Sequence, residues 1–203
     1  PTFELLGIEK GIEIVTMSDI PTGTGMGSSG SFLVASLTAL LESQRKRTPP
    51  QELAELACHI EMDLAGHPVG KQDQYMAAFG GLTKLEIATD GKTIVSPINI
   101  SADTLEELQA RLTLYYTGIT RSASKVLQEQ SDALENNHRP AVDGLHETKE
   151  LGRKILEALE TDDLDGFGKM LDEHWRVKKQ RASSVTDPAI DKWYTTAQAA
   201  GAS

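Results

Sequence analysis

The chain has 203 residues, of which 39% are hydrophobic and 25% are charged, a composition typical of a soluble globular protein that excludes collagen-like, disordered and disulfide-rich classes. Its 20 basic and 30 acidic residues leave a net charge of -10, which argues against a general nucleic-acid-binding protein because such proteins need basic surfaces against phosphate. No apolar run approaches the roughly 20 residues of a membrane-spanning helix, and we expect no contact with a membrane.

The two ends of the sequence and its cysteine content bear on the length of the whole polypeptide and on its cellular compartment. The sequence begins at Pro1 and stops at Ser203, directly after a predicted helix, so we expect it to be a piece of a longer polypeptide. The single cysteine, Cys58, cannot form a disulfide within the chain, which is consistent with a reducing compartment. We therefore predict a cytoplasmic location.

The first residues predict a strand, a glycine-rich loop and a buried helix. Residues 13–17 alternate weakly and are rich in β-branched side chains, a pattern typical of a strand. The glycines and hydroxyl residues of 22–30 predict a loop. From Ser31 to Leu41 apolar residues recur on nearly every face, which predicts a helix that is buried all round.

Two further helices follow. Thr48 and Gln51 have the spacing of a capping box, and the prolines between them suit a first helical turn. Apolar residues then recur at helical spacing as far as Leu64. After a break, residues 72–79 predict a short helix that is closed by two glycines.

The pattern then changes to a hairpin and a helical half. Asp90 and Gly91 between the apolar segments 82–87 and 93–98 predict a β-hairpin. The segment 112–116 predicts one more strand. Helices are predicted over about 121–136, 141–160, 163–181 and 188–200.

Strands and helices mix in the first half of the chain, and helices dominate the second half. This distribution predicts an α+β fold with two lobes. We place the boundary near Ala110, so that residues 1–110 form a first lobe that contains the glycine loop and residues 111–203 form a mostly helical second lobe.

The most specific local pattern is the loop 21–30, which reads Pro-Thr-Gly-Thr-Gly-Met-Gly-Ser-Ser-Gly. Glycines such as Gly23, Gly25 and Gly27 allow backbone N–H groups to approach an anion. The helix that follows adds a dipole that favours phosphate at its N-terminus. The loop therefore predicts a phosphate-binding site.

Ser28 and Ser29 can donate to phosphate or ligate Mg²⁺ through a hydroxyl, although a flexible loop with a serine helix cap remains the alternative. Residues 25–30 match G-x-G-x-x-G, but no strand with an acidic end follows the helix, which excludes a dinucleotide-binding fold. Residues 66–72 have neither the spacing nor the hydroxyl residue of a Walker loop.

Carboxylates and cations elsewhere in the chain suit phosphoryl transfer, which needs a metal ion, positive charge and a carboxylate near the attacking hydroxyl. Glu61 lies at the edge of the apolar face of its helix, and Asp73 begins the short helix. Ser29 and Glu61 would supply oxygen ligands to Mg²⁺, and Asp73 would face the acceptor hydroxyl. Lys71 and Arg121 would supply the positive charge.

Taken singly, these residues also have simpler interpretations. An isolated helical glutamate such as Glu61 is usually a solvated charge. An acidic residue in a first turn, such as Asp73, is favoured by the helix dipole alone. Arg121 is equally consistent with an exposed arginine beside a capped helix.

Three stretches resemble a known family. Residues 21–29, with the pattern Pro-x-x-x-Gly-x-Gly-Ser-Ser, resemble the phosphate-binding motif of the GHMP kinase superfamily, which includes galactokinase, homoserine kinase, mevalonate kinase and phosphomevalonate kinase. Residues 66–75 and 116–124 are similar to the bacterial D-glycero-D-manno-heptose 7-phosphate kinase branch. The resemblance covers essentially the whole chain, but it does not include the first and third motifs of the family.

The resemblance implies a two-lobed α+β GHMP kinase fold, incomplete at both ends, with a helix-rich second lobe. It implies ATP as the phosphoryl donor and Mg²⁺ as the cofactor. The residues expected at the ATP phosphates are Gly23, Gly25, Gly27, Ser28 and Ser29. The family pattern further implies Ser29 and Glu61 as Mg²⁺ ligands, Asp73 as the catalytic carboxylate and Arg121 as a contact of the acceptor phosphate or the transition state.

The implied reaction is phosphorylation of the anomeric hydroxyl of a heptose 7-phosphate, a step that feeds surface polysaccharide synthesis. The expected partner is a small-molecule sugar phosphate, without nucleic acid or membrane, and a homodimer is a further expectation. Two alternatives stay open, a noncatalytic nucleotide-binding fragment of the same ancestry and a sibling GHMP kinase that acts on another small molecule.

Overall fold

The computed structural model describes residues 2–9, 11–20, 24–118, 123–136, 138–181 and 185–203. The chain forms two compact units, one made of residues 1–95 and 119–124 and the other of residues 96–118 and 125–203. The boundary that we predicted near Ala110 lies inside the second unit, to which helix α5 (Ala102–Arg111) belongs. The assignment of the units to two kinase lobes stays a prediction.

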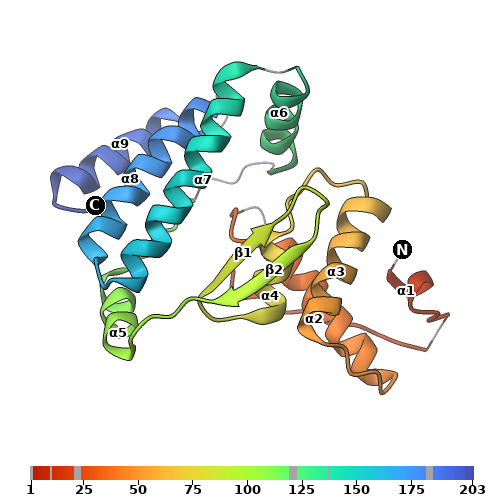
Figure 1. Ribbon diagram of the computed structural model, residues 1–203. Helices are drawn as coiled ribbons and strands as arrows, with labels where there is room; N and C mark the ends of the chain where they lie inside the picture. Colours follow the sequence, from red (N-terminus) through yellow and green to blue (C-terminus); the bar gives the residue numbers. More distant parts are fainter. Residues whose placement is uncertain (1, 10, 21–23, 119–122, 137, 182–184) are drawn as a thin grey trace. The chain divides into compact units, whose positions relative to one another are not determined.

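The first unit combines helices with a β-hairpin (Figure 1). In chain order its elements are α1 (Thr2–Leu5), α2 (Ser28–Ser43), α3 (Pro50–Cys58), a π-helical segment η1 (His59–Leu64), α4 (Gln72–Phe79), β1 (Thr83–Ile87) and β2 (Thr93–Pro97). Helices α2, α3 and α4 pack against one another, and β1 contacts α4. The short helix predicted at residues 72–79 is confirmed.

The core of the first unit is made by the apolar faces of α2, α3 and α4. Its main cluster consists of Val34, Leu37, Leu41, Leu53, Ala57 and Ile60. A second cluster joins Ala54 and Cys58 of α3 to Tyr75 of α4. Phe32 on α2 is 55% exposed. The prediction that this helix is buried all round is therefore wrong, because only one of its faces packs against α3 and α4.

The predicted hairpin is confirmed. Strands β1 and β2 form a two-stranded sheet. The turn between them is closed by the N–H of Ala88, which donates to the carbonyl of Lys92 at 2.9 Å, and by the N–H of Lys92, which donates to Oδ1 of Asp90 at 2.9 Å. Gly91 adopts a φ of 81°, a left-handed conformation that glycine enters without strain.

The two other predicted strands, 13–17 and 112–116, are wrong. Both segments are irregular, and their apolar side chains face solvent, with Met17 96% exposed and Leu114 77% exposed. A strand exists only when a neighbouring strand accepts and donates its backbone hydrogen bonds. Among the described residues, only β1 and β2 form such a pair.

The starts of two helices differ from the predictions. Helix α2 begins at Ser28, three residues before the predicted Ser31, because the serines join the first turn. Helix α3 begins at Pro50 after Pro49, and no side chain caps it, so the capping box of Thr48 and Gln51 is wrong. The amide of Gln51 instead donates to Oε1 of Glu55 at 2.7 Å.

The second unit is helical. Besides α5 it contains most of α6 (Ala123–Glu135), then α7 (Arg139–Glu160), α8 (Leu164–Arg181) and α9 (Pro188–Ala199). Helices α7 and α8 lie side by side (Figure 1). Leu151 and Leu159 of α7 and Val177 of α8 are buried. The four predicted helices are confirmed to within a few residues, whereas α5 was not predicted because its apolar residues are too sparse to show a helical period.

Side chains cap the N-termini of three helices of this unit. Ser101 accepts from the N–H of Thr104 at 3.0 Å before α5. Asp163 accepts from the N–H of Gly166 at 2.8 Å before α8. Asp187 accepts from the N–H of Ala189 and of Ile190 before α9. Each bond satisfies an N–H group that has no partner within its helix.

The class of fold is therefore α+β with a helix-rich second unit, as predicted. None of the helices in the described part of the chain has the length and apolar character needed to cross a membrane.

Candidate active site

The glycine-rich loop leads into the N-terminus of α2. Gly25 and Gly27 have φ values of 76° and 67°, which only glycine adopts without strain. Gly27 is the N-cap residue of α2, and no side chain caps this helix end. Ser28, partly buried, and Ser29, exposed, occupy the first turn. Gly23 lies outside the described residues.

Asp73 packs directly against this loop. A Cβ atom at Gly27 would lie 3.1 Å from Cγ of Asp73, and a Cβ atom at Gly30 would lie 3.0 Å from Cβ of Asp73. Only the absence of side chains at these two positions allows α4 to come so close to α2. The structure thus brings Asp73 to the phosphate-binding loop that the sequence predicts.

Glu61 is buried through a departure from regular helix. It lies in η1, where the N–H of Ala65 bonds to the carbonyl of Ile60 five residues earlier, at 2.9 Å. Such wide turns rotate the side chains that follow and are frequent at functional sites. Glu61 is only 5% exposed. The inward orientation that the sequence left open is therefore confirmed.

Gln74 links the two carboxylate positions. Its Nε2 donates to Oε2 of Glu61 at 2.6 Å, in a buried hydrogen bond. It directly follows Asp73, and its backbone nitrogen lies 3.2 Å from where a Cβ of Gly30 would be. Glu61, Gln74, Asp73 and the start of α2 are consequently contiguous. Gln74 was not predicted, because a buried glutamine has no sequence signal of its own.

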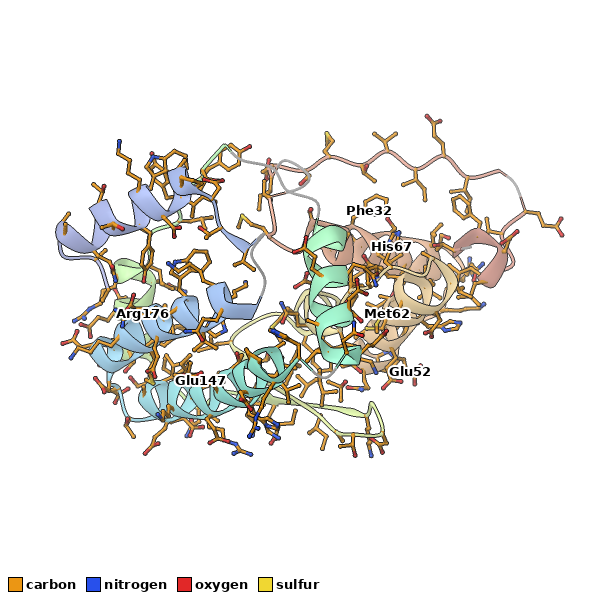
Figure 2. The ribbon with its side chains drawn as sticks, turned by 90° about the horizontal axis from the view of Figure 1, so that it is seen from above. Phe32, Glu52, Met62, His67, Glu147 and Arg176 are labelled. Carbon is orange, nitrogen blue, oxygen red and sulfur yellow. The ribbon has the colours of Figure 1, made fainter. Side chains whose placement is uncertain are left out.

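Of the two proposed cations, the structure describes only Lys71. Nζ of Lys71 donates to the carbonyl of Gly91 at 2.6 Å, so its charge lies at the hairpin turn. Arg121 is outside the described residues. His67, labelled in Figure 2, is the imidazole beside the buried carboxylate, with Nδ1 3.9 Å from Oε1 of Glu61.

The donor set fits a hard divalent cation. Mg²⁺ takes oxygen ligands and commonly only one or two from protein. The buried carboxylate of Glu61 and the hydroxyl of Ser29 are of this type. Within the described ranges, no cluster of three or more His, Cys, Asp or Glu side chains could hold a metal, which argues against a closed zinc-type site there.

Cys58 lies on α3 one turn before Glu61 and is buried. Burial raises the pKa of its thiol to about 11, despite the opposing charge of Lys71. The thiol is therefore neutral and does not serve as a nucleophile in this site.

Comparison with known proteins defines the class. Residues 2–81 match the family model described as GHMP kinases N terminal domain. Together with the relatives below, this match shows that residues 2–81 are a GHMP kinase N-terminal domain. The predicted α+β fold of that family is confirmed.

Among individual proteins, a D-glycero-alpha-D-manno-heptose 7-phosphate kinase of Campylobacter jejuni is 33% identical over 182 residues, which are 90% of this chain and 53% of the relative. A solved sugar kinase structure from Campylobacter jejuni matches with a TM-score of 0.65 and 31% identity, over 89% of this chain and 50% of the other. A D-glycero-D-manno-heptose 1-phosphate kinase structure from Bacteroides thetaiotaomicron matches with a TM-score of 0.57 and 31% identity, over 80% and 46%. The chain spans about half the length of these relatives.

Proposed function

We propose that the chain carries the phosphate loop and catalytic carboxylate of an ATP-dependent sugar kinase. The reaction transfers the γ-phosphoryl group of ATP to the anomeric hydroxyl of D-glycero-D-manno-heptose 7-phosphate. The heptose phosphate kinases among the relatives support this acceptor. The similar stretches at residues 66–75 and 116–124 support it as well.

One observation carries the proposal, the contact of Asp73 with Gly27 and Gly30. Phosphate groups bind at helix N-termini, where unpaired N–H groups and the dipole favour negative charge. A carboxylate held against that N-terminus is close to any phosphoryl group bound there. This is the arrangement that a kinase needs between its donor phosphate and its acceptor hydroxyl.

In the proposed reaction the hydroxyl oxygen of the sugar forms a bond to the γ-phosphorus, and the bond between that phosphorus and the bridging oxygen of ADP breaks. The carboxylate of Asp73 takes the hydroxyl proton. The N–H groups of Gly25, Gly27 and the first turn of α2 hold the phosphates, with Ser28 donating.

Ser29 and Glu61 are the residues that would hold Mg²⁺. When bound, the cation neutralises the negative charge of the phosphates and favours its transfer. We assign Arg121 to the acceptor phosphate. We assign Lys71 to supply positive charge; its Nζ donates to the carbonyl of Gly91 at 2.6 Å, and a change of side-chain rotamer would release it toward the phosphates.

The proposal is tested by measuring ADP release from this chain with MgATP and, in turn, heptose 7-phosphate, fucose, galactose and mevalonate. We expect release with heptose 7-phosphate alone. Release with another acceptor identifies a sibling kinase and contradicts the assigned substrate. Binding of MgATP without release for any acceptor contradicts catalysis by this chain and supports a nucleotide-binding fragment.

A further inference from the structure

The amide of Gln74 is a buried polar group for which the proposed reaction provides no role. Gln74 is 1% exposed and Glu61 is 5% exposed. The hydrogen bond between them, at 2.6 Å, joins α4 to the π-helical segment. Gln74 therefore connects the carboxylate assigned to the metal with Asp73, the carboxylate assigned to the acceptor hydroxyl.

The amide is held in place from two sides. The backbone of Gln74 is pressed against Gly30, since a Cβ there would lie 3.2 Å from its nitrogen. The next residue, Tyr75, is fully buried in the core. A donor with so little freedom fixes one oxygen of Glu61. The other oxygen, Oε1, has the ring of His67 at 3.9 Å, which is beyond hydrogen-bonding distance.

The bond leaves an unused acceptor. Oε1 of Gln74 is buried and has no hydrogen-bond partner among the described residues. Buried polar atoms of a native fold usually have a partner, and each exception calls for an explanation such as a water or an ion. Because both amide atoms are bonded to one carbon, this acceptor lies next to the Glu61 carboxylate.

We propose that Gln74 is a positioning residue for the metal ligand Glu61. Its Nε2 holds Oε2 of Glu61, so that Oε1 of Glu61 stays available to Mg²⁺. The inference rests on the proposed function, which assigns Mg²⁺ to Glu61. Groups that orient a metal ligand in this way typically change metal affinity by about 10- to 100-fold when they are removed.

The test substitutes Gln74→Met, which keeps the volume of the side chain and removes the donor. Mn²⁺ is the probe, titrated in the presence of ADP and followed by electron paramagnetic resonance. We expect its Kd to rise by about 10-fold or more. An unchanged Kd in the folded variant overturns the proposal.

Gln44→Met is the matched control. Gln44 also donates through Nε2, to the carbonyl of Leu6 at 2.9 Å, and its Oε1 is also buried without a partner in the described structure. This variant should lose stability while its Kd for Mn²⁺ stays within about two-fold of wild type, since Gln44 touches no metal ligand. An equal loss of Mn²⁺ affinity in both variants would show a merely structural role for Gln74.

A second variant keeps the test valid if Gln74→Met does not fold. Gln74→Asn keeps an amide but is one methylene too short to reach Glu61, and the same rise in Kd is expected. When transfer is measured, the Mg²⁺ concentration for half-maximal rate should rise while the rate at saturating Mg²⁺ is largely retained. If the wild type turns over and both variants need the same Mg²⁺ concentration for half-maximal rate, the positioning role of Gln74 is overturned. The kinase proposal then stands.

The same experiments also distinguish a failure of the proposed kinase reaction from a failure of the positioning role. Binding of Mn²⁺ that depends on Gln74, without turnover for any acceptor, supports the positioning role and contradicts transfer. Absence of Mn²⁺ binding by the wild type overturns the positioning role together with the assignment of Mg²⁺ to Glu61.

Discussion

Helices of the two units begin in different ways. In the second unit, Ser101, Asp163 and Asp187 each accept a hydrogen bond from a first-turn N–H group. In the first unit, α2 begins at Gly27, and no side chain caps it. Every helix has N–H groups without partners at its start. The three capped helices satisfy part of them with their own side chains, whereas α7 of the second unit and α2 of the first begin without a side-chain cap. What sets α2 apart is the carboxylate of Asp73, which lies against its first turn.

Two polar clusters, one in each unit, differ in how their hydrogen bonds are satisfied. In the second unit Asp172 accepts from Tyr194, from Gln198 at 2.7 Å and from Arg176 (Figure 2) at 2.6 Å. Burial and the bond to Asp172 raise the pKa of Tyr194 to about 12, so its hydroxyl remains a donor. In the first unit the Glu61 and Gln74 pair keeps an unused acceptor. Buried polar atoms without a partner in the described structure also occur at Gln44 in the first unit and at Trp175 in the second, so it is the bond of Gln74 to Glu61 that sets this acceptor apart.

The largest expected effect comes from Asp73→Asn, which removes the proton acceptor while preserving size. We expect turnover to fall by about 10²- to 10⁴-fold, the range typical of a general base. Binding of MgATP should change little, because the N–H groups of α2 remain. The measurement is ADP release beside nucleotide binding by calorimetry. Asp103→Asn, an exposed acid in the first turn of α5, is the control, and equal turnover of the two variants would contradict the role of Asp73.

Cys58 should react slowly with iodoacetamide in the folded chain. With a pKa of about 11, its thiolate fraction at pH 8 is about 100-fold below that of an ordinary thiol, and only the thiolate reacts. The rate should recover on unfolding in denaturant. Because Cys58 is the single cysteine, the reaction also reports the first unit alone. Fast labelling of the native chain would contradict the burial of this helix.

Gly30→Ala and Gly152→Ala should have opposite effects. A Cβ at Gly30 meets Asp73 at 3.0 Å, so we expect a loss of about 1–3 kcal/mol from overpacking. Gly152 lies within α7 with nothing within 4 Å of a Cβ, so alanine should stabilise by about 0.5–1 kcal/mol. Denaturant unfolding measures both, with Cys58 labelling for the first unit and tryptophan fluorescence for the second. Equal changes in the free energy of unfolding of the two variants would contradict the close packing of Asp73 against Gly30.

A smaller effect than that of Gly30→Ala is expected for Asp187→Ala. Loss of the cap of α9 should destabilise the second unit by about 1 kcal/mol. Both tryptophans, Trp175 and Trp193, lie in this unit, so the midpoint of their fluorescence change should fall. Nucleotide binding should be unaffected, and a clear loss of binding would show that caps of the second unit also serve the site.

Local patterns predicted much of the fold. The short helix at 72–79, the hairpin around Asp90 and four helices of the second half follow from glycines, apolar periods and turn residues that act over a few positions. The strands at 13–17 and 112–116 were wrong, since a β-branched segment becomes a strand only beside another strand. The capping box at Thr48 was wrong because the prolines start the helix later.

The site was predicted in part. Asp73 and the glycine loop were selected from their residue types, and the structure brings them together. Glu61 was left between a solvated and an inward position, and only the structure shows it buried within a π-helical segment. Lys71 was expected to supply positive charge for the transfer, and the structure shows its ammonium donating to the carbonyl of Gly91. Gln74 was missed, because its importance lies in a contact with a residue thirteen positions away.

The sequence by itself determined the α+β class and predicted a phosphate-binding loop, since glycines, hydroxyls and carboxylates act through their own chemistry and spacing. The tertiary structure alone decided which of them meet. It pressed Asp73 onto two glycines and turned Glu61 inward onto Gln74, because packing between distant segments selects one conformation from several that the local sequence permits.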